Sequence, residues 1–210
     1  MFLDFEKLAP REGYAWLTQA IIPRPIAWVS TVSADGKPNL APFSFFQAVC
    51  SNPPTLMFVP TNNRDGGKKD TLRNIEAVPE FVVNLVSHAL AAPMNTTAAP
   101  LPYGENEFAH AGVVPVSSTK VRPPRVADSP VAIECTLDRI VTIGSGVGAG
   151  NVVFGRIVAM HVADSVLGDD GKSLDPLKLD LIARLSGDFY MRTGELFTIT
   201  RPAGGSALRS

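Results

Sequence analysis

The chain contains the run Pro23-Arg24-Pro25-Ile26-Ala27-Trp28-Val29-Ser30-Thr31-Val32-Ser33. This run is followed by the turn Ala34-Asp35-Gly36-Lys37 and then by Pro38-Asn39-Leu40-Ala41-Pro42-Phe43-Ser44-Phe45-Phe46. Apolar and β-branched residues on both sides of the turn predict strands at residues 26–33 and 39–49. An Asp-Gly pair between two such runs is a strong signal for a β-hairpin. The stretch therefore indicates a chain that begins with antiparallel strands, which is not the alternation of a doubly wound βαβ sheet.

Short apolar runs bounded by turn residues recur along the chain. They predict further strands at residues 55–60, 81–86, 131–137, 139–143, 152–162 and 196–200. Helical patterns predict short helices at residues 70–78, 88–97, 105–111 and 177–185, the first of them capped by Asp70 or Thr71. Prolines between residues 115 and 130 indicate an extended excursion. We therefore predict a single domain over residues 1–210 that is mainly β, with peripheral helices.

The composition excludes several classes of protein. The 210 residues carry 19 Lys and Arg against 20 Asp and Glu, so the formal net charge is −1. This balance excludes nucleic-acid or membrane-surface binding by bulk electrostatics, and no apolar run approaches the roughly 20 residues of a membrane span. The first ten residues lack the apolar segment of a secretory signal. We expect a cytoplasmic protein with buried, reduced thiols at Cys50 and Cys135, although the sequence leaves a disulfide open.

One glycine motif suggests a dinucleotide site. Gly144-Ser145-Gly146-Val147-Gly148-Ala149 fits the pattern G-x-G-x-x-A, which binds a pyrophosphate where a strand ends and a helix begins. The β-branched run at residues 151–158 predicts a strand instead of that helix, so we interpret the motif as a hairpin loop. No histidine has a ligand-spaced His or Cys and no nucleophile motif is present, so we assign no metal site and no catalytic residue.

Polar and aromatic side chains gather around the first hairpin. Ser30, Thr31 and Ser33 end one strand, and their hydroxyls can bind the polar edge of a heterocycle, although Ser and Thr also simply end strands. Asn39 and residues 44–46 lie on the paired strand, where the amide and hydroxyl groups can contact a ring and the two phenylalanines can form a wall. The phenylalanines fit an ordinary core equally well.

A basic loop, Arg64-Asp65-Gly66-Gly67-Lys68-Lys69-Asp70-Thr71, leads into the helix predicted at residues 70–78. A helix N-terminus presents free N–H groups and partial positive charge, which suit a phosphate. Asp70 would repel a phosphate unless it caps the helix, and the loop alone also fits a solvated basic surface. Together, the hairpin and the loop predict one ligand, a planar polar ring with a phosphate tail.

The chain also resembles a known family. The runs Pro23-Arg24-Pro25-Ile26-Ala27-Trp28-Val29-Ser30-Thr31 and Ala41-Pro42-Phe43-Ser44-Phe45-Phe46 are similar to the opening of flavin reductase-like proteins, and the likeness continues through Lys69-Asp70-Thr71 to Tyr190. Ser186 departs from the glycine expected in a late turn. The resemblance implies a flavoredoxin-like, FMN-binding split β-barrel that works as a homodimer, with flavin near the subunit interface.

The resemblance also implies a set of site residues. Residues 30–33 and 44–46 would hold the isoalloxazine, with Asn39 and Ala41 beside it, and residues 69–71 would lie at the phosphate end. With two edge residues and one cation of the basic loop, the predicted cofactor-binding residues are Arg24, Trp28, Ser30, Thr31, Val32, Ser33, Asn39, Ala41, Ser44, Phe45, Phe46, Arg64, Lys69, Asp70 and Thr71.

The resemblance favours an NAD(P)H-dependent flavin reductase. Hydride would pass from nicotinamide to flavin, so no protein nucleophile is required. The reduced flavin would be released to a partner oxygenase or would pass electrons to another acceptor. Two alternatives stay open. One is an FMN electron-transfer protein without an efficient nicotinamide site, in the manner of flavoredoxin, and the other is a barrel that holds a haem-like or deazaflavin cofactor.

Overall fold

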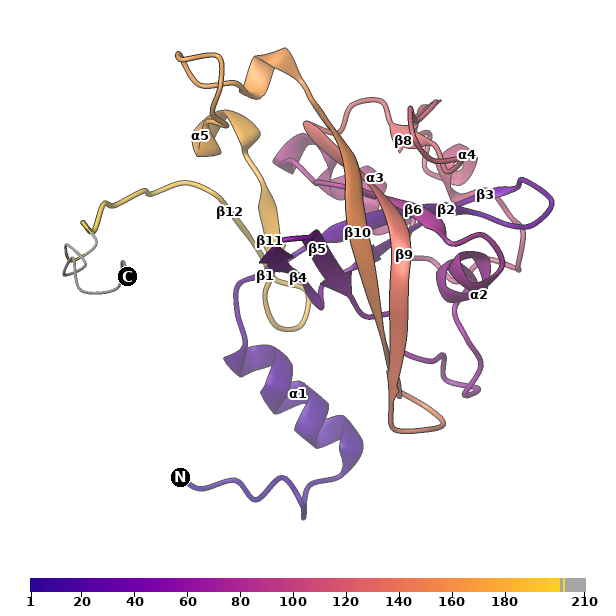
Figure 1. Ribbon diagram of the computed structural model, residues 1–210. Helices are drawn as coiled ribbons and strands as arrows, with labels where there is room; N and C mark the ends of the chain where they lie inside the picture. Colours follow the sequence, from indigo (N-terminus) through magenta and orange to yellow (C-terminus); the bar gives the residue numbers. More distant parts are fainter. Residues whose placement is uncertain (201, 203–210) are drawn as a thin grey trace, which may run out of the picture.

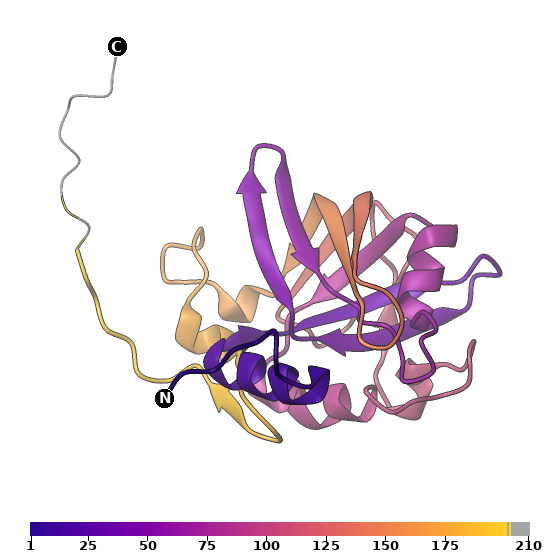
Figure 2. The same cartoon turned by 90° about the horizontal axis from the view of Figure 1, so that it is seen from below.

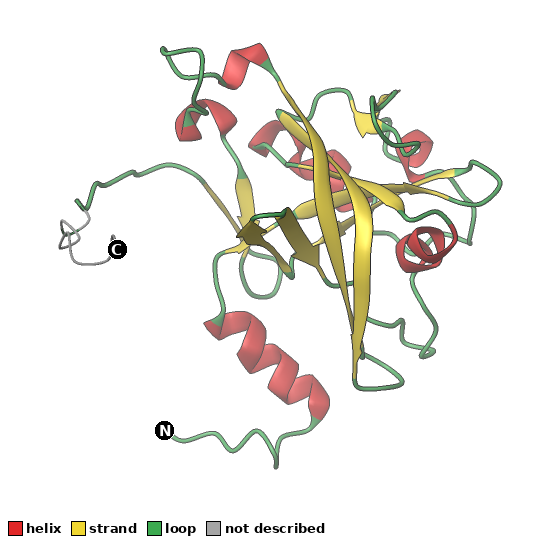
Figure 3. Cartoon of the chain, in the orientation of Figure 1, coloured by secondary structure: helices red, strands yellow, loops and turns green. Residues whose placement is uncertain are grey.

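A computed structural model describes residues 1–200 and residue 202 and consists mainly of β-strands, with short helices at the periphery (Figures 1 and 3). The largest sheet has the strand order β3-β2-β6-β9-β10-β5-β4. Its strands are β2 (Ala27–Val32), β3 (Pro38–Phe43), β4 (Phe46–Ser51), β5 (Pro54–Phe58), β6 (Glu80–Asn84), β9 (Val131–Ile143) and β10 (Gly150–Val162). A three-stranded sheet contains β1 (Arg24–Pro25), β11 (Ile182–Arg184) and β12 (Tyr190–Arg192). A two-stranded sheet contains β7 (Pro115–Val116) and β8 (Arg125–Val126).

Short helices lie around this sheet. They are α1 (Pro10–Ala20), α2 (Asp70–Ala77), α3 (Ala91–Thr96), α4 (Glu107–His110) and α5 (Pro176–Leu179), with single 3₁₀ turns at His88–Leu90 and Asp164–Val166. Of these, α2, α3 and α4 pack against the strands β2 and β3. None of the described helices has the length and apolar character needed to cross a bilayer.

The seven-stranded sheet curls into a split barrel. β3 and β4 are its two edges, yet only two residues separate them in the chain, so the sheet must turn back on itself. Inside it, Phe43 packs on Phe58 with ring centroids 5.2 Å apart, and Phe58 packs on Phe81 at 5.3 Å. β4 is exposed along most of its length, and the β4–β5 hairpin stands out from the body (Figure 2). This architecture confirms the predicted fold class.

Both hairpins predicted from turn residues are present. β2 and β3 pair in antiparallel register with Thr31 opposite Asn39, and Gly36 adopts a φ of 78°, which a residue with a side chain rarely does. The glycine motif at residues 144–149 joins β9 to β10 without any helix. This confirms that the motif is a hairpin loop.

Two predicted elements near the C-terminus were wrong. The helix predicted at residues 177–185 ends at Leu179 because Asp180 takes a left-handed conformation with a φ of 49°, and residues 182–184 then pair with β1. Residues 196–200 form no strand.

Other boundaries also needed correction. The strand predicted at residues 39–49 divides at Ser44 and Phe45 into β3 and β4, whereas residues 131–143 form one continuous strand instead of two. Helix α1 was not predicted. Both cysteines are free, but only Cys135 is buried, since Cys50 lies on the exposed strand β4.

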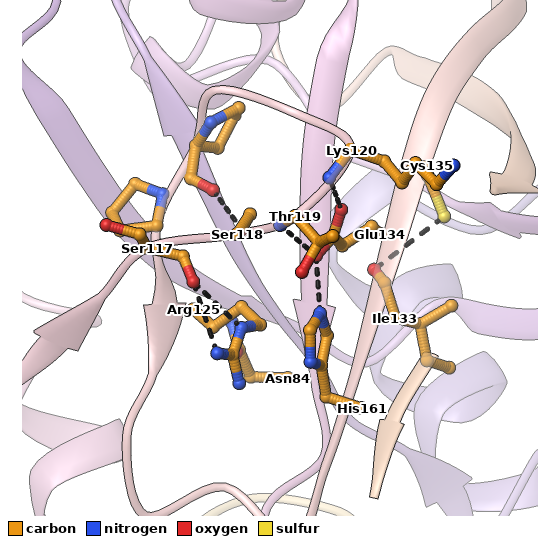
Figure 4. Close-up of polar contacts among 12 residues, drawn as sticks. Asn84, Ser117, Ser118, Thr119, Lys120, Arg125, Ile133, Glu134, Cys135 and His161 are labelled. Carbon is orange, nitrogen blue, oxygen red and sulfur yellow. Dashed lines mark hydrogen bonds and ion pairs between the residues drawn. The ribbon is translucent and has the colours of Figure 1, made fainter. Parts of the chain in front are cut away.

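A buried carboxylate fixes the loop between β7 and β8 to the sheet (Figure 4). Glu134 of β9 is fully buried, and its oxygens accept hydrogen bonds from the backbone N–H groups of Thr119 and Lys120 at 2.7 and 2.6 Å. His161 of β10 lies 2.5 Å from the same carboxylate. Burial alone would raise the pKa of Glu134, but these three contacts outweigh it and hold the pKa below its usual value.

We expect Glu134→Gln to lower the free energy of unfolding by about 2 kcal/mol near neutral pH, because charge-assisted hydrogen bonds are lost. A carboxyl whose folded pKa is lowered stabilises the protein above its unfolded pKa of about 4.3 and loses this contribution as the pH falls through the folded value. Urea unfolding at several pH values should therefore show a shallower acid dependence in Glu134→Gln. The matched control is Glu76→Gln on the surface, and equal acid dependence in wild type and Glu134→Gln would contradict this role.

Candidate functional site

The predicted site residues of the first hairpin lie on opposite faces of the sheet. Successive side chains of a strand alternate between faces. Thr31 and Asn39 face α2, where Thr31 Oγ1 accepts a 3.0 Å hydrogen bond from Asn74 and the Asn39 amide donates to Thr71 Oγ1 at 3.0 Å. Trp28 faces away from α2 and packs in the apolar cluster that includes residues of α3 and α4. These side chains therefore cannot all contact one ligand.

Several predicted contacts are instead structural. Trp28 is fully buried and its indole N–H donates to Thr97 Oγ1 at 2.8 Å, so the prediction that it lines the edge of a site was wrong. Ser30 is equally buried and donates to the carbonyl of Pro124. Ser33 Oγ accepts from the backbone N–H of Lys37 and closes the hairpin turn. The polar groups of these side chains are therefore already satisfied within the chain.

Val32 belongs to a different part of the surface. It lines a pocket of about 390 Å³ beneath the loop between β7 and β8, together with Pro38 of β3 and Arg122. The side chains of Thr31 and Ser44 do not line this pocket. Val32 therefore lies on the same face of β2 as Ser30, whose hydroxyl bonds to Pro124 of this pocket, and on the opposite face from Thr31.

Arg24 is buried and connects three parts of the chain. Its guanidinium donates to the carbonyls of Thr18 at 2.5 Å, Ile21 at 3.0 Å and Leu185 at 2.6 Å, and its Nε lies 3.4 Å from Ser44 Oγ. Burial lowers the pKa of this guanidinium below its usual value. Arg24 therefore supports the corner at Ser44 from beneath, whereas the sequence placed it at the open edge of a site.

The corner between β3 and β4 presents the accessible residues of the hairpin. Ala41, Ser44, Phe45 and Phe46 are all half-buried, so each offers part of its side chain to a ligand. The Phe45 ring lies 6.5 Å from the ring of Tyr14 on α1. The Phe45 carbonyl accepts a hydrogen bond from Val59, the residue after β5, at 2.9 Å.

The basic loop starts five residues after Val59, the residue that bonds to this corner. Asn63 lies only four residues after Val59, a span of at most about 13 Å in an extended chain. The Asn63 side chain accepts a 3.1 Å hydrogen bond from Lys69 Nζ, which is half-buried, whereas Lys68 pairs outward with Glu76 at 2.6 Å. Among the residues that the structure describes, neither Arg64 nor Lys69 forms an ion pair. The loop therefore holds two cations that have no direct ion-pair partner among the described residues.

Helix α2 begins at Asp70, at the end of this loop. Lys69 is the N-cap residue and no side chain caps the helix, so the prediction that Asp70 or Thr71 caps it was wrong. Asp70 stands in the first turn, where its negative charge interacts favourably with the helix dipole. Burial raises the pKa of Asp70, while Arg73 and Lys69 act in the opposite direction. Thr71 is 1% exposed and bonded to Asn39, so it joins α2 to β3.

Asparagines that the sequence did not single out hold the loop in place. The backbone N–H and side-chain amide of Asn62 donate to the carbonyls of Ala149 and Gly146, at 2.9 and 3.0 Å. The Asn151 amide donates to Asn62 Oδ1 at 2.9 Å. The loop that joins β9 and β10 therefore packs against the basic loop. Isolated asparagines carry no periodic signal, so only the fold identifies their role.

Comparisons with known proteins agree with this geometry. A family model described as the flavin reductase like domain matches residues 19–178. An uncharacterized protein from Halalkalibacterium halodurans is 37% identical over 204 residues, which cover 96% of this chain and 97% of that protein. Nitrilotriacetate monooxygenase component B from Bacillus cereus has a TM-score of 0.89 and 33% identity, covering 95% of this chain and 98% of that one. The 2-nitrobenzoate 2-nitroreductase NbaA from Pseudomonas fluorescens has a TM-score of 0.84 and 29% identity, covering 100% of this chain and 99% of that one. The chain therefore belongs to the flavin reductase-like family.

Proposed function

We propose that this protein binds FMN and acts as an NAD(P)H-dependent flavin reductase. The observation that carries the proposal is that Arg64 and Lys69, which form no ion pair with the described residues, precede the N-terminus of α2. The same loop follows shortly after Val59, which is bonded to the half-buried aromatic corner. A phosphate fits the first feature, because helix N–H groups and free cations both stabilise its charge. A planar ring fits the second, where Phe45 supplies an apolar surface and Ser44 a hydroxyl.

The residues of the chain then have distinct roles. Flavin held at this site would supply the hydride-transfer chemistry, with nicotinamide as the hydride donor. Lys69 and Arg64 hold the phosphate, while Ala41, Ser44 and Phe45 orient the ring. Arg24 fixes Ser44 through its contacts with three backbone carbonyls. Thr31, Asn39 and Thr71 act from beneath by holding α2 against the hairpin.

The proposal includes two partners. A monooxygenase component B among the structural neighbours supports transfer of reduced flavin to an oxygenase. We also propose a homodimer, because large apolar side chains remain exposed on this chain, including Ile143, Phe189 and Phe197 at 63%, 72% and 84%. Homodimer interfaces are richer in apolar surface than the rest of a protein's exterior.

Anaerobic mixing tests the reductase activity. The FMN-loaded protein is mixed separately with NADH and NADPH, and loss of the flavin absorbance is followed with time. We expect rapid bleaching with at least one nucleotide. Slow or absent bleaching with both, while the protein still accepts electrons from a chemical reductant, would contradict the reductase and favour the electron-transfer alternative.

A further inference from the structure

The chain leaves the barrel after β12 as an extended arm, residues 194–200. In Figures 1 and 2 this segment runs away from the body. No backbone hydrogen bond joins it to the rest of the described chain, whose last such bond in this region runs from Thr193 to Leu181. Leu196, Phe197 and Ile199 of the arm are 53%, 84% and 79% exposed. The arm therefore carries apolar side chains that the described residues of its own chain leave largely exposed.

The arm has the sequence of a β-strand. Phe197 and Ile199 alternate with Thr198 and Thr200, and β-branched and aromatic residues of this kind favour extended structure. The arm continues directly from β12, which is the edge strand of its small sheet. An extended apolar segment next to a free edge is suited to contact with another chain.

An apolar pocket lies where the arm begins. It has a volume of about 250 Å³, below the range of about 300–1,000 Å³ typical of small-molecule sites. No charged side chain lines it, which does not suit a phosphate or a nucleotide. A single large apolar side chain suits the small volume and uncharged lining of this pocket better than a phosphate or a nucleotide does. Its lining residues include Pro25, Ile26, Val86, Ile182, Met191 and Thr193.

We propose that the arm of one copy docks on a second copy, with Phe197 in the partner's apolar pocket. Thr193 lines the pocket, and Phe197 follows four residues later, about 13 Å along an extended chain. To reach its own pocket, the chain would have to reverse direction directly after β12, whereas the arm runs outward (Figure 2). A two-fold axis that brings two pockets within this reach lets each arm cross to the other copy.

Exposed apolar residues around the pocket extend this surface. Ile22 and Met191 are 47% and 41% exposed, and Pro23 is exposed beside them. The proposal rests on the homodimer proposed above and adds the segment that the two copies exchange. It makes no use of the flavin chemistry.

Cysteine cross-linking tests the docking directly. In a Cys50→Ser background, one copy carries Phe197→Cys and a differently tagged, co-expressed copy carries Met191→Cys. Mild oxidation should join the two tagged chains. The control, Thr198→Cys on the other side of the arm, should give at least about tenfold less product. Absence of the cross-link, or a link within one chain when both substitutions are in the same copy, would overturn the proposal.

A second measurement distinguishes the contribution of the arm to dimer affinity from the existence of the dimer. Burial of one phenylalanine changes an association constant by about ten- to a hundredfold, so Phe197→Asp should raise the dimer dissociation constant by at least that factor. Thr198→Asp should change it only a few fold. Analytical ultracentrifugation gives both values. A monomeric wild type would contradict the homodimer and the arm together, whereas a dimer that Phe197→Asp leaves intact would contradict the arm alone.

Discussion

Replacement of Gly155 by Ala is expected to lower the free energy of unfolding by about 3 kcal/mol, which is the upper end of the range of losses typical of overpacked cores. A Cβ atom at this position in β10 would lie 2.2 Å from Cζ of Phe81 and 2.9 Å from its Cε1. Phe81 is fully buried and packs edge-on against Phe58, so the ring has no free space into which it can move. Chemical denaturation of the purified variant measures the loss.

Two further variants check that the ring is the cause. Gly150→Ala in the same strand should lower the free energy of unfolding much less, because its Cβ would approach only the Cγ1 atom of Val59, at 3.3 Å. Phe81→Leu combined with Gly155→Ala should recover part of the loss, since the smaller side chain removes the clash. If Gly155→Ala and Gly150→Ala had equal effects, the close packing inferred at Phe81 would be contradicted.

Lys69→Ala is expected to weaken FMN binding by about 1–3 kcal/mol, roughly five- to 150-fold in dissociation constant. Lys69 is the half-buried cation directed along the loop toward Asn63, and it stands at the N-terminus of α2. Loss of its charge would remove a charge-assisted contact to the phosphate. Fluorescence titration with FMN measures the change, and riboflavin, which lacks the phosphate, should show almost none.

Lys68→Ala provides a matched control for this prediction. Lys68 is the neighbouring residue with the same charge, but its amine pairs with Glu76 and is half exposed. We expect its removal to change FMN affinity only slightly, because exposed ion pairs contribute little. Thr71 is a poor test, since its loss would also break the hydrogen bond to Asn39. Equal losses for Lys68→Ala and Lys69→Ala would contradict the placement of the phosphate.

Local signals in the sequence predict much of the barrel. The Asp35-Gly36 pair fixes the first hairpin because Gly36 alone tolerates the left-handed turn. The helix predicted at residues 177–185 was wrong because a distant pairing decides that segment: Ile182–Arg184 bond to Arg24–Pro25, over 150 residues away in the chain. Helix α1 has a proline at its first position, a start signal that the prediction did not use.

The site was harder to predict than the fold. Clustering of hydroxyl and amide residues in the hairpin suggested one surface, but strand alternation divides Thr31 and Ser30 between two faces. The same clustering cannot distinguish a buried hydroxyl from an accessible one, and both of these are fully buried. Contacts such as Asn63 with Lys69 depend on the path of a loop, for which the sequence has no periodic signal.

Titration of the purified protein with FMN shows whether the chain binds this flavin through its phosphate. The flavin is stripped, FMN is added in steps, and quenching of its fluorescence is followed to saturation, with riboflavin as the phosphate-free comparison. We expect saturable binding of one FMN per chain, tighter than that of riboflavin, and we expect Lys69→Ala to remove most of this difference in affinity. Absence of saturable binding, or equal affinity for FMN and riboflavin in the wild type, would contradict this expectation.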